Sequence, residues 1–119
     1  MATHNELGKK GEELAVEFLL KNNYQILERN WRFKKAEVDI IALKNNVLAV
    51  IEVKTRSTDY FGNPQDFVNP KKIKLLVEAI DYYITTKNVD VDVRFDIVAI
   101  LKQQQHYKIE HLKDAFLYF

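Results

Sequence analysis

The feature that most constrains this fold is a pair of strand-like segments separated by two asparagines. The segments are Ala36 to Leu43 and Val47 to Lys54, and Asn45-Asn46 lie between them. Asparagine tolerates positive φ, so this dipeptide favours a two-residue hairpin loop. Such a loop pairs Lys44 with Val47 and thereby fixes the register of both strands.

This register places Asp39 directly opposite Glu52, with their Cβ atoms roughly 5 Å apart. The other predicted pairs are Leu43 with Leu48, Ile41 with Val50, and Glu37 with Lys54. A slip of one residue would put the two carboxylates on different faces, because side-chain direction alternates along a strand. We therefore expect Asp39 and Glu52 to share one face of the hairpin.

The two faces of the predicted hairpin differ in polarity. One face is wholly apolar and carries Val38, Ile40, Ala42, Val47, Ala49, Ile51 and Val53. The other is apolar near the turn, where Ile41, Leu43, Leu48 and Val50 lie, and charged at its far end. A sheet that is apolar on both sides is buried, so charges gathered at one end indicate a cleft. The alternative is a solvated outer face, on which acidic and basic residues commonly alternate.

Paired carboxylates at this spacing favour a bound cation, because two like charges this close repel each other. Carboxylate oxygens without nearby cysteine or histidine suit Mg²⁺ or Mn²⁺. Lys54 follows Glu52 by two residues and therefore projects on the same face. There its ammonium group would orient a water molecule or neutralise charge on a phosphorane-like transition state.

The composition narrows the class of protein. A chain of 119 residues predicts one domain spanning residues 1–119, and a net charge of +1 gives no global basic signature for nucleic acid. There is no cysteine, which excludes disulfides and thiolate metal sites. We find neither a basic and apolar leader nor an apolar run of membrane-spanning length, so a cytoplasmic location with no membrane partner is expected.

The remaining segments predict an α/β fold with a mixed central sheet flanked by helices. A helix from Glu6 to about Asn23 precedes an edge strand from Tyr24 to Phe33. After a long loop, Asn69 caps a helix that begins at Pro70 and ends near Lys87-Asn88. Strands follow around Val91 to Leu101 and Tyr107 to Leu112. A right-handed crossover through the second helix would set the fourth strand beside the third.

Outside the hairpin, Glu12 is the acidic residue of most interest. At 100° per residue it projects beside Gly8 and Ala15 on the margin of the buried stripe, whereas Glu13 and Glu17 point away. The alternative is an ordinary solvated glutamate beside that stripe.

The histidines and the pair of Arg94 and Asp96 do not predict a catalytic site. The three histidines, His4, His106 and His111, are scattered and predict neither a zinc site nor a nucleophile triad. Arg94 and Asp96 share one side of a strand and predict an internal ion pair.

This order of elements and these residues resemble the PD-(D/E)XK nuclease superfamily, and more narrowly the YraN-type family of small bacterial proteins. The resemblance implies a restriction endonuclease-like αβββαβ core. The matching pieces are Gly8-x-x-Gly11-Glu12, Glu37 to Ala42, Glu52 to Arg56, Phe61-Gly62-x-Pro64, Lys72, Arg94 to Asp96, and Ala115-Phe116. Ala36 departs from the pattern, because the family usually has glycine there.

The resemblance also implies roles for individual residues. Asp39, Glu52 and the Val53 carbonyl would hold Mg²⁺ or Mn²⁺, Lys54 would be the catalytic lysine, and Glu12 the first-helix carboxylate. Gln65 would orient a phosphate or a water. Residues expected to grip the substrate backbone are Arg56, Lys71, Lys72 and Lys74, together with Arg29, Arg32, Lys34 and Lys35 if their turn curls toward the cleft. For the run of Lys71, Lys72 and Lys74 at the start of the second helix, a solvated surface is the alternative reading.

Three hypotheses about function follow from the sequence. The first is a metal-dependent DNA endonuclease, a hydrolase acting on linear or branched DNA. The second is a catalytically silent nucleic-acid-binding module that needs a partner, and the third is an adaptor with a fortuitous acidic cleft. A homodimer would suit an enzyme that cuts two strands, by analogy alone.

Overall fold

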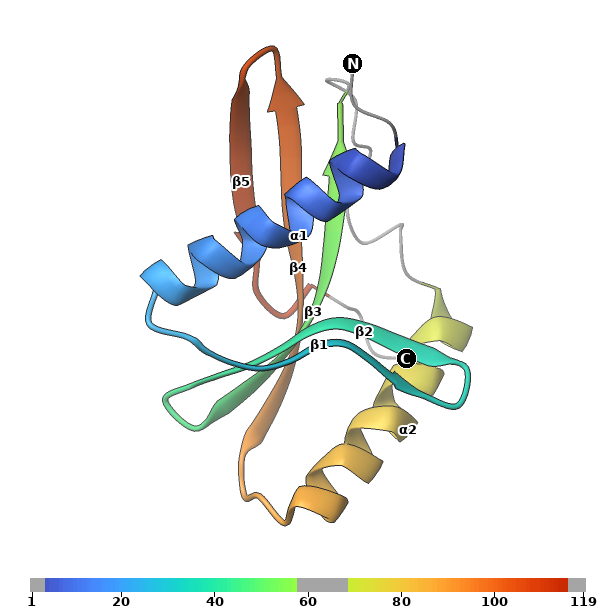
Figure 1. The fold of residues 1–119 in the computed structure, drawn as a ribbon. Coiled ribbons are helices and arrows are strands. Elements are labelled where there is room, and N and C mark those ends of the chain that lie inside the picture. Colours follow the sequence, from blue (N-terminus) through green and yellow to red (C-terminus); the bar gives the residue numbers. More distant parts are fainter. Residues whose placement is uncertain (1–3, 58–68, 116–119) are drawn as a thin grey trace.

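The protein is a mixed five-stranded sheet with one helix packed on each face (Figure 1). The computed structural model describes residues 4–57 and 69–115. The elements within these ranges are α1 (His4–Lys21), β1 (Gln25–Phe33), β2 (Ala36–Lys44), β3 (Val47–Arg56), α2 (Pro70–Lys87), β4 (Asp92–Gln103) and β5 (His106–Leu112). The predicted α/β class and element order are confirmed.

The strands lie in the order β1-β2-β3-β4-β5. The first three are antiparallel, β4 lies parallel to β3, and β5 returns antiparallel to β4. The predicted edge position of β1 and the crossover through α2 are therefore confirmed. In Figure 1, β1 and β2 run across the view while β4 and β5 stand nearly upright, so the sheet twists strongly between β2 and β4.

The predicted hairpin turn is present between β2 and β3. Asn45 and Asn46 have φ values of 50° and 65°, as a tight two-residue turn with two left-handed residues requires. The ladder runs in the predicted register from Lys44 opposite Val47 to Ile40 opposite Ile51.

Beyond Ile40 the β2–β3 ladder ends, whereas β2 continues to pair with β1 as far as Ala36. The predicted pairings of Asp39 with Glu52 and of Glu37 with Lys54 are therefore wrong, because both lie beyond the last ladder pair. Glu37 instead accepts a hydrogen bond of 3.0 Å from Arg32 on β1, and Lys54 forms an ion pair with Glu52. The separation of β2 from β3 leaves space between them at the level of Asp39.

Two apolar clusters hold the helices to the sheet. On one face, Ala15 and Leu19 of α1 cluster with sheet residues Ile40, Ala42, Ala49, Ile51, Val98 and Ile100. On the other face, Ile73, Leu76, Ile80 and Tyr83 of α2 cluster with Val38, Ile41, Leu48, Val50, Phe95 and Ile97. Val38 was predicted to share a face with Ile40, and this was wrong because regular alternation fails where β2 leaves β3.

The ends of α2 form as predicted. The Asn69 side chain accepts a 2.8 Å hydrogen bond from the backbone amide of Lys72, and Pro70 occupies the first turn. Asn88 closes the helix in the left-handed conformation, with φ 54°. None of the helices in the described ranges is long and apolar enough to cross a lipid bilayer.

A fully buried carboxylate, Asp96, connects β4 to its surroundings. It accepts two hydrogen bonds from Arg94 Nε, at 2.9 and 3.1 Å, and lies 2.8 Å from His111 Nε2. Arg94 Nη2 also donates to the hydroxyl of Tyr24 at 2.7 Å. The ion pair predicted for Arg94 and Asp96 is present, and His111 extends it.

The pKa of Asp96 reflects this network. Burial alone would raise it, but the hydrogen bonds from His111, Arg94 and the Asp114 amide hold the pKa below its ordinary value. The stabilisation from ionised Asp96 is therefore present above the unfolded pKa and lost as pH falls through the lowered folded pKa.

We expect Asp96→Ala to lower the free energy of unfolding by about 3–5 kcal/mol, because it leaves Arg94 without its buried partner. The exposed Asp92 on the same strand provides the control, and Asp92→Ala should change stability by no more than about 0.5 kcal/mol. Urea unfolding of the three proteins measures both effects. Equal losses in the two variants would contradict this account.

Helix α1 crosses β3 at close range at Gly11. A Cβ atom on Gly11 would lie 1.9 Å from Thr55 Oγ1, whereas one on Gly8 would meet nothing within 4 Å. The two glycines of the Gly8-x-x-Gly11 pattern therefore differ, because only Gly11 is needed for helix–strand contact.

This difference gives a paired prediction. Gly8→Ala should stabilise the protein by about 0.5–1 kcal/mol, since alanine is the better helix former. Gly11→Ala should destabilise it by about 1–3 kcal/mol through overpacking against Thr55. Thermal unfolding compares the two variants, and the double variant with Thr55→Ala should recover part of the loss. Stabilisation by Gly11→Ala would show that α1 does not lie this close to β3.

Candidate active site

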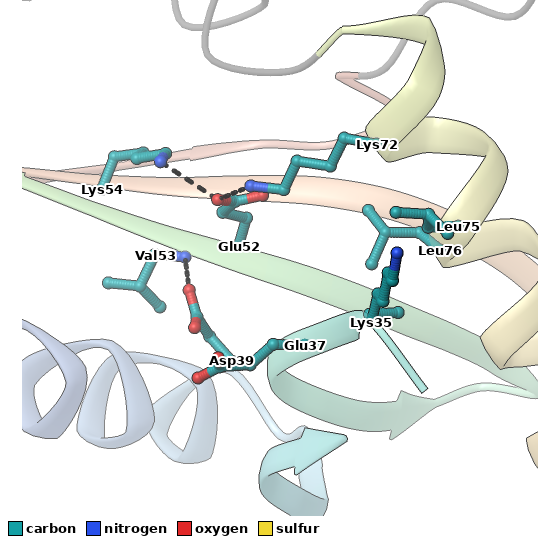
Figure 2. A pocket seen from close by; sticks show the side chains of 10 residues that line it. Lys35, Glu37, Asp39, Glu52, Val53, Lys54, Lys72, Leu75 and Leu76 are labelled. Carbon is teal, nitrogen blue, oxygen red and sulfur yellow. Dashed lines mark hydrogen bonds and ion pairs between the residues drawn. The ribbon is translucent and has the colours of Figure 1, made fainter. Parts of the chain in front are cut away.

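A cavity of about 460 Å³ opens beside the point where β2 and β3 separate. Its lining residues come from β2, β3, α2 and the turn before β2: Lys35, Ala36, Glu37, Asp39, Glu52, Val53, Lys54, Lys72, Leu75 and Leu76 (Figure 2). The predicted residues Asp39, Glu52, Val53, Lys54 and Lys72 are therefore brought together around one cavity.

Asp39 lies in the space between the two strands. Its Oδ2 accepts a 2.8 Å hydrogen bond from the backbone amide of Val53, in place of the ladder that ended at Ile40. The pKa of Asp39 is raised to about 6: burial raises it most, the charges of Glu52, Glu12 and Glu37 also raise it, and the Val53 hydrogen bond lowers it. The ionised form of Asp39 is therefore disfavoured, chiefly by burial and in addition by the neighbouring carboxylates.

Glu52 is held by two lysines. Lys54 Nζ lies 3.0 Å from Glu52 Oε1, and Lys72 Nζ from α2 forms an ion pair with the same oxygen. The Glu52 side chain is only 14% exposed. Figure 2 shows both ammonium groups reaching Glu52 from opposite directions above β3.

Glu12 lies next to the cavity on α1. Its Oε1 is buried and has no hydrogen-bond partner among the described residues, and its charge contributes to the raised pKa of Asp39. Glu13 and Glu17 are exposed, so the predicted position of Glu12 on the margin of the buried stripe is confirmed. Glu12 does not itself line the cavity.

The two principal carboxylates have different partners. Figure 2 shows Glu52 turned toward α2 and Asp39 on the other side of the β3 ribbon, where the Val53 amide reaches it. Among residues 4–57 and 69–115, no group of three or more acidic, histidine or cysteine side chains is gathered for a metal ion. The predicted convergence on one cation is therefore not present in this conformation.

Relatives of the same length place this chain in a family. The model of "Uncharacterised protein family UPF0102" matches residues 11–100. The chain belongs to the UPF0102 family. It is 62% identical to a UPF0102 protein of Christiangramia forsetii and 57% identical to one of Flavobacterium psychrophilum, each over the full length of both chains. A UPF0102 protein of Bacteroides fragilis is 48% identical, with 98% of this chain and 96% of the relative covered.

The donor set of this UPF0102 protein fits a hard divalent cation. Asp39, Glu52 and Glu12 offer carboxylate oxygens, and Mg²⁺ is usually bound by one or two carboxylates plus waters and substrate oxygens. The buried Oε1 of Glu12 has no hydrogen-bond partner among the described residues, and Asp39 is a partly buried carboxylate whose charged form is disfavoured without a cation. Occupation would require Glu52 to turn from Lys72 toward Asp39.

The residues expected to bind substrate differ in their position relative to the cavity. Lys72 lines the cavity, whereas Arg56 lies at the end of β3, does not line it, and donates a 2.9 Å hydrogen bond to the Thr55 carbonyl. Gln65 lies outside the described residues, as does Phe61-Gly62-x-Pro64.

Sequence reasoning did not find every residue of this UPF0102 cavity. Leu75 and Leu76 of α2 line part of it. Lys35, which was expected to grip substrate if its turn curls toward the cleft, does line the cavity from the turn before β2. The spacing of Leu76 in the apolar stripe of α2 indicated burial only. The ion pair between Lys72 and Glu52 was also missed, because the sequence carries no signal for where α2 begins in space relative to β3.

Asp39 gives a pH-dependent prediction for the metal-free UPF0102 protein. Because its folded pKa is about 6, against 3.8 unperturbed, ionised Asp39 opposes folding above pH 6, and this cost disappears as the pH falls toward 4. Asp39→Asn keeps an oxygen for the Val53 amide and should raise the free energy of unfolding by about 1–2 kcal/mol near neutral pH.

Urea unfolding across this pH range measures the effect. The gain from Asp39→Asn should shrink between about pH 6 and pH 4. Glu110→Gln is the control, since Glu110 is exposed on β5 and is not among the charges that act on Asp39. A gain that does not change with pH would rule out the electrostatic cause.

Proposed function

We propose that this protein is a metal-dependent nuclease of the PD-(D/E)XK type, related to the YraN-type proteins, that hydrolyses phosphodiester bonds in DNA. The observation that carries the proposal is the placement of Asp39 and Glu52, from adjacent strands, around one cavity with Lys54 against Glu52. The order α1, β1–β3, α2, β4 agrees with the αβββαβ core of that superfamily.

In this proposal Asp39, Glu52 and the Val53 carbonyl hold Mg²⁺ or Mn²⁺. When bound, the metal supplies Lewis acidity toward a phosphate oxygen and lowers the pKa of a coordinated water. Glu12 is near enough to contribute charge at Asp39, and it would bind a water or help to hold a second cation.

In this proposal Lys54 acts on the attacking water or on the phosphoryl group from the edge of the site. Its ammonium group lies 3.0 Å from Glu52 Oε1 and its side chain is 22% exposed, so it lies at the boundary between the site and solvent. From there it would orient a water molecule or stabilise negative charge that develops on the phosphoryl oxygens. Lys72 and Arg56 would contact the substrate backbone, which positions the strand without reading its sequence.

A second function is favoured by one specific observation. Glu52 is already neutralised by two lysines, and no group of three metal-ligating side chains is assembled among the described residues. A nucleic-acid-binding module that is silent without a partner would have this arrangement. The partner would then supply the change that turns Glu52 toward Asp39.

Cleavage assays on linear, nicked and four-way-junction DNA with Mg²⁺ or Mn²⁺ test the nuclease. We expect cleavage that chelation abolishes, and losses of about 10²–10³-fold in Asp39→Ala, Glu52→Gln and Lys54→Met. The control is Glu110→Gln, an exposed glutamate on β5, which should cleave like the wild type.

Two results would reject the nuclease: no cleavage of any substrate by the wild type, or equal cleavage by Asp39→Ala. DNA binding that survives both chelation and Glu52→Gln, without turnover, would support the silent binding module instead.

A further inference from the structure

Lys72 and Lys54 make an unequal pair of contacts with Glu52. Lys54 lies on the same strand as Glu52, two residues along, so its contact is local to β3. Lys72 comes from the first turn of α2, and its ion pair with Glu52 is the contact that joins α2 to this carboxylate. The Lys72 contact can therefore break without any change in β3.

Charge is distributed unevenly across the cavity. One oxygen of Glu52 meets two ammonium groups, although one positive charge is sufficient to neutralise one carboxylate. Asp39 has the Val53 amide and no cationic partner among the described residues. Both lysines line the cavity, and the second ammonium group therefore adds positive charge at Glu52 while Asp39 has none beside it.

The backbone of Lys72 is fixed, whereas its side chain is partly exposed to solvent. Asn69 accepts a hydrogen bond from its backbone amide, and the neighbouring Ile73 is buried against the sheet. Its side chain is 35% exposed and carries a flexible four-carbon stem. A lysine with this anchoring can change partners while α2 stays in place.

We infer that Lys72 is an exchangeable counter-ion: it neutralises Glu52 in the metal-free protein, is displaced when a divalent cation binds, and then contacts a phosphate of the nucleic acid. This inference rests on the proposed function, since it describes how the same site is loaded. Lys72 then has opposite effects on the two ligands. Its ammonium group competes with the metal ion for Glu52, and it assists binding of the nucleic acid.

The first experiment measures Mn²⁺ affinity without nucleic acid, by electron paramagnetic resonance of the free ion. Lys72→Met removes the competing charge and keeps the backbone cap, so it should tighten Mn²⁺ binding about fivefold. Lys74→Met is the matched control: it removes the same charge from an exposed position on the same turn of α2 and should change affinity by less than about twofold.

Equal effects of the two substitutions, or weaker Mn²⁺ binding in Lys72→Met, would overturn the inference. Thermal unfolding of both variants confirms that they are folded before affinities are compared. If the wild type binds no Mn²⁺ at all, the metal site of the proposed function fails as well, and this result is distinct from wild-type binding that Lys72→Met leaves unchanged.

The second experiment measures DNA binding with Ca²⁺, which occupies hard-oxygen sites, and separately with a chelator. Lys72→Met should weaken binding several-fold more in Ca²⁺ than in chelator, because only the metal-loaded protein releases Lys72 to the phosphate. Lys74→Met should have the same effect in both buffers. An identical loss for Lys72→Met in both would show that its ammonium group never changes partner.

Discussion

The hydrogen bond from the Val53 amide to the Asp39 carboxylate is the interaction on which the candidate site depends. It forms just beyond the last ladder pair, Ile40 with Ile51, where the Val53 amide would otherwise lack a partner in β2. A carboxylate thus takes the place of a strand carbonyl. Because it does so, the two strands can separate without leaving this amide unsatisfied, and the separation creates the cavity.

The charges around the cavity follow from its position at the end of a buried sheet. Near the turn, β2 and β3 are covered by α1 on one face and α2 on the other, so both faces are apolar. At the far end the same strands carry Asp39, Glu52 and Lys54 into a partly enclosed space. The cost of burying these groups is met by specific partners at Glu52 and only partly at Asp39, and the raised pKa of Asp39 measures the difference.

Much of this arrangement could be predicted from local sequence. Asn45-Asn46 specified the turn, the turn specified the register, and Asn69-Pro70 specified the start of α2. These are short-range effects of backbone conformation, which the residues themselves determine. The same register predicted Asp39 opposite Glu52, but the ladder ends just before this pair, and the two residues meet only as lining residues of one cavity.

What could not be predicted depends on twist and on contacts between distant elements. The end of the ladder after Ile40 moved Glu37 to Arg32 and Val38 to the α2 face, and alternation alone cannot indicate where a ladder stops. The ion pair of Lys72 with Glu52 and the contact of His111 with Asp96 join segments whose separation in space is set by the whole sheet. The position of Glu12 beside Asp39 was predicted only as a direction on the helix.

The close crossing of α1 over β3 has a mechanical consequence for the acidic residues. With no room for a methyl group between Gly11 and Thr55, the helix has a fixed point of support on the strand. It can tilt about this point, but it cannot slide by one residue without a side chain colliding with β3. Glu12 is adjacent to this contact, so a tilt of α1 about it would displace Glu12 less than it would displace the ends of the helix.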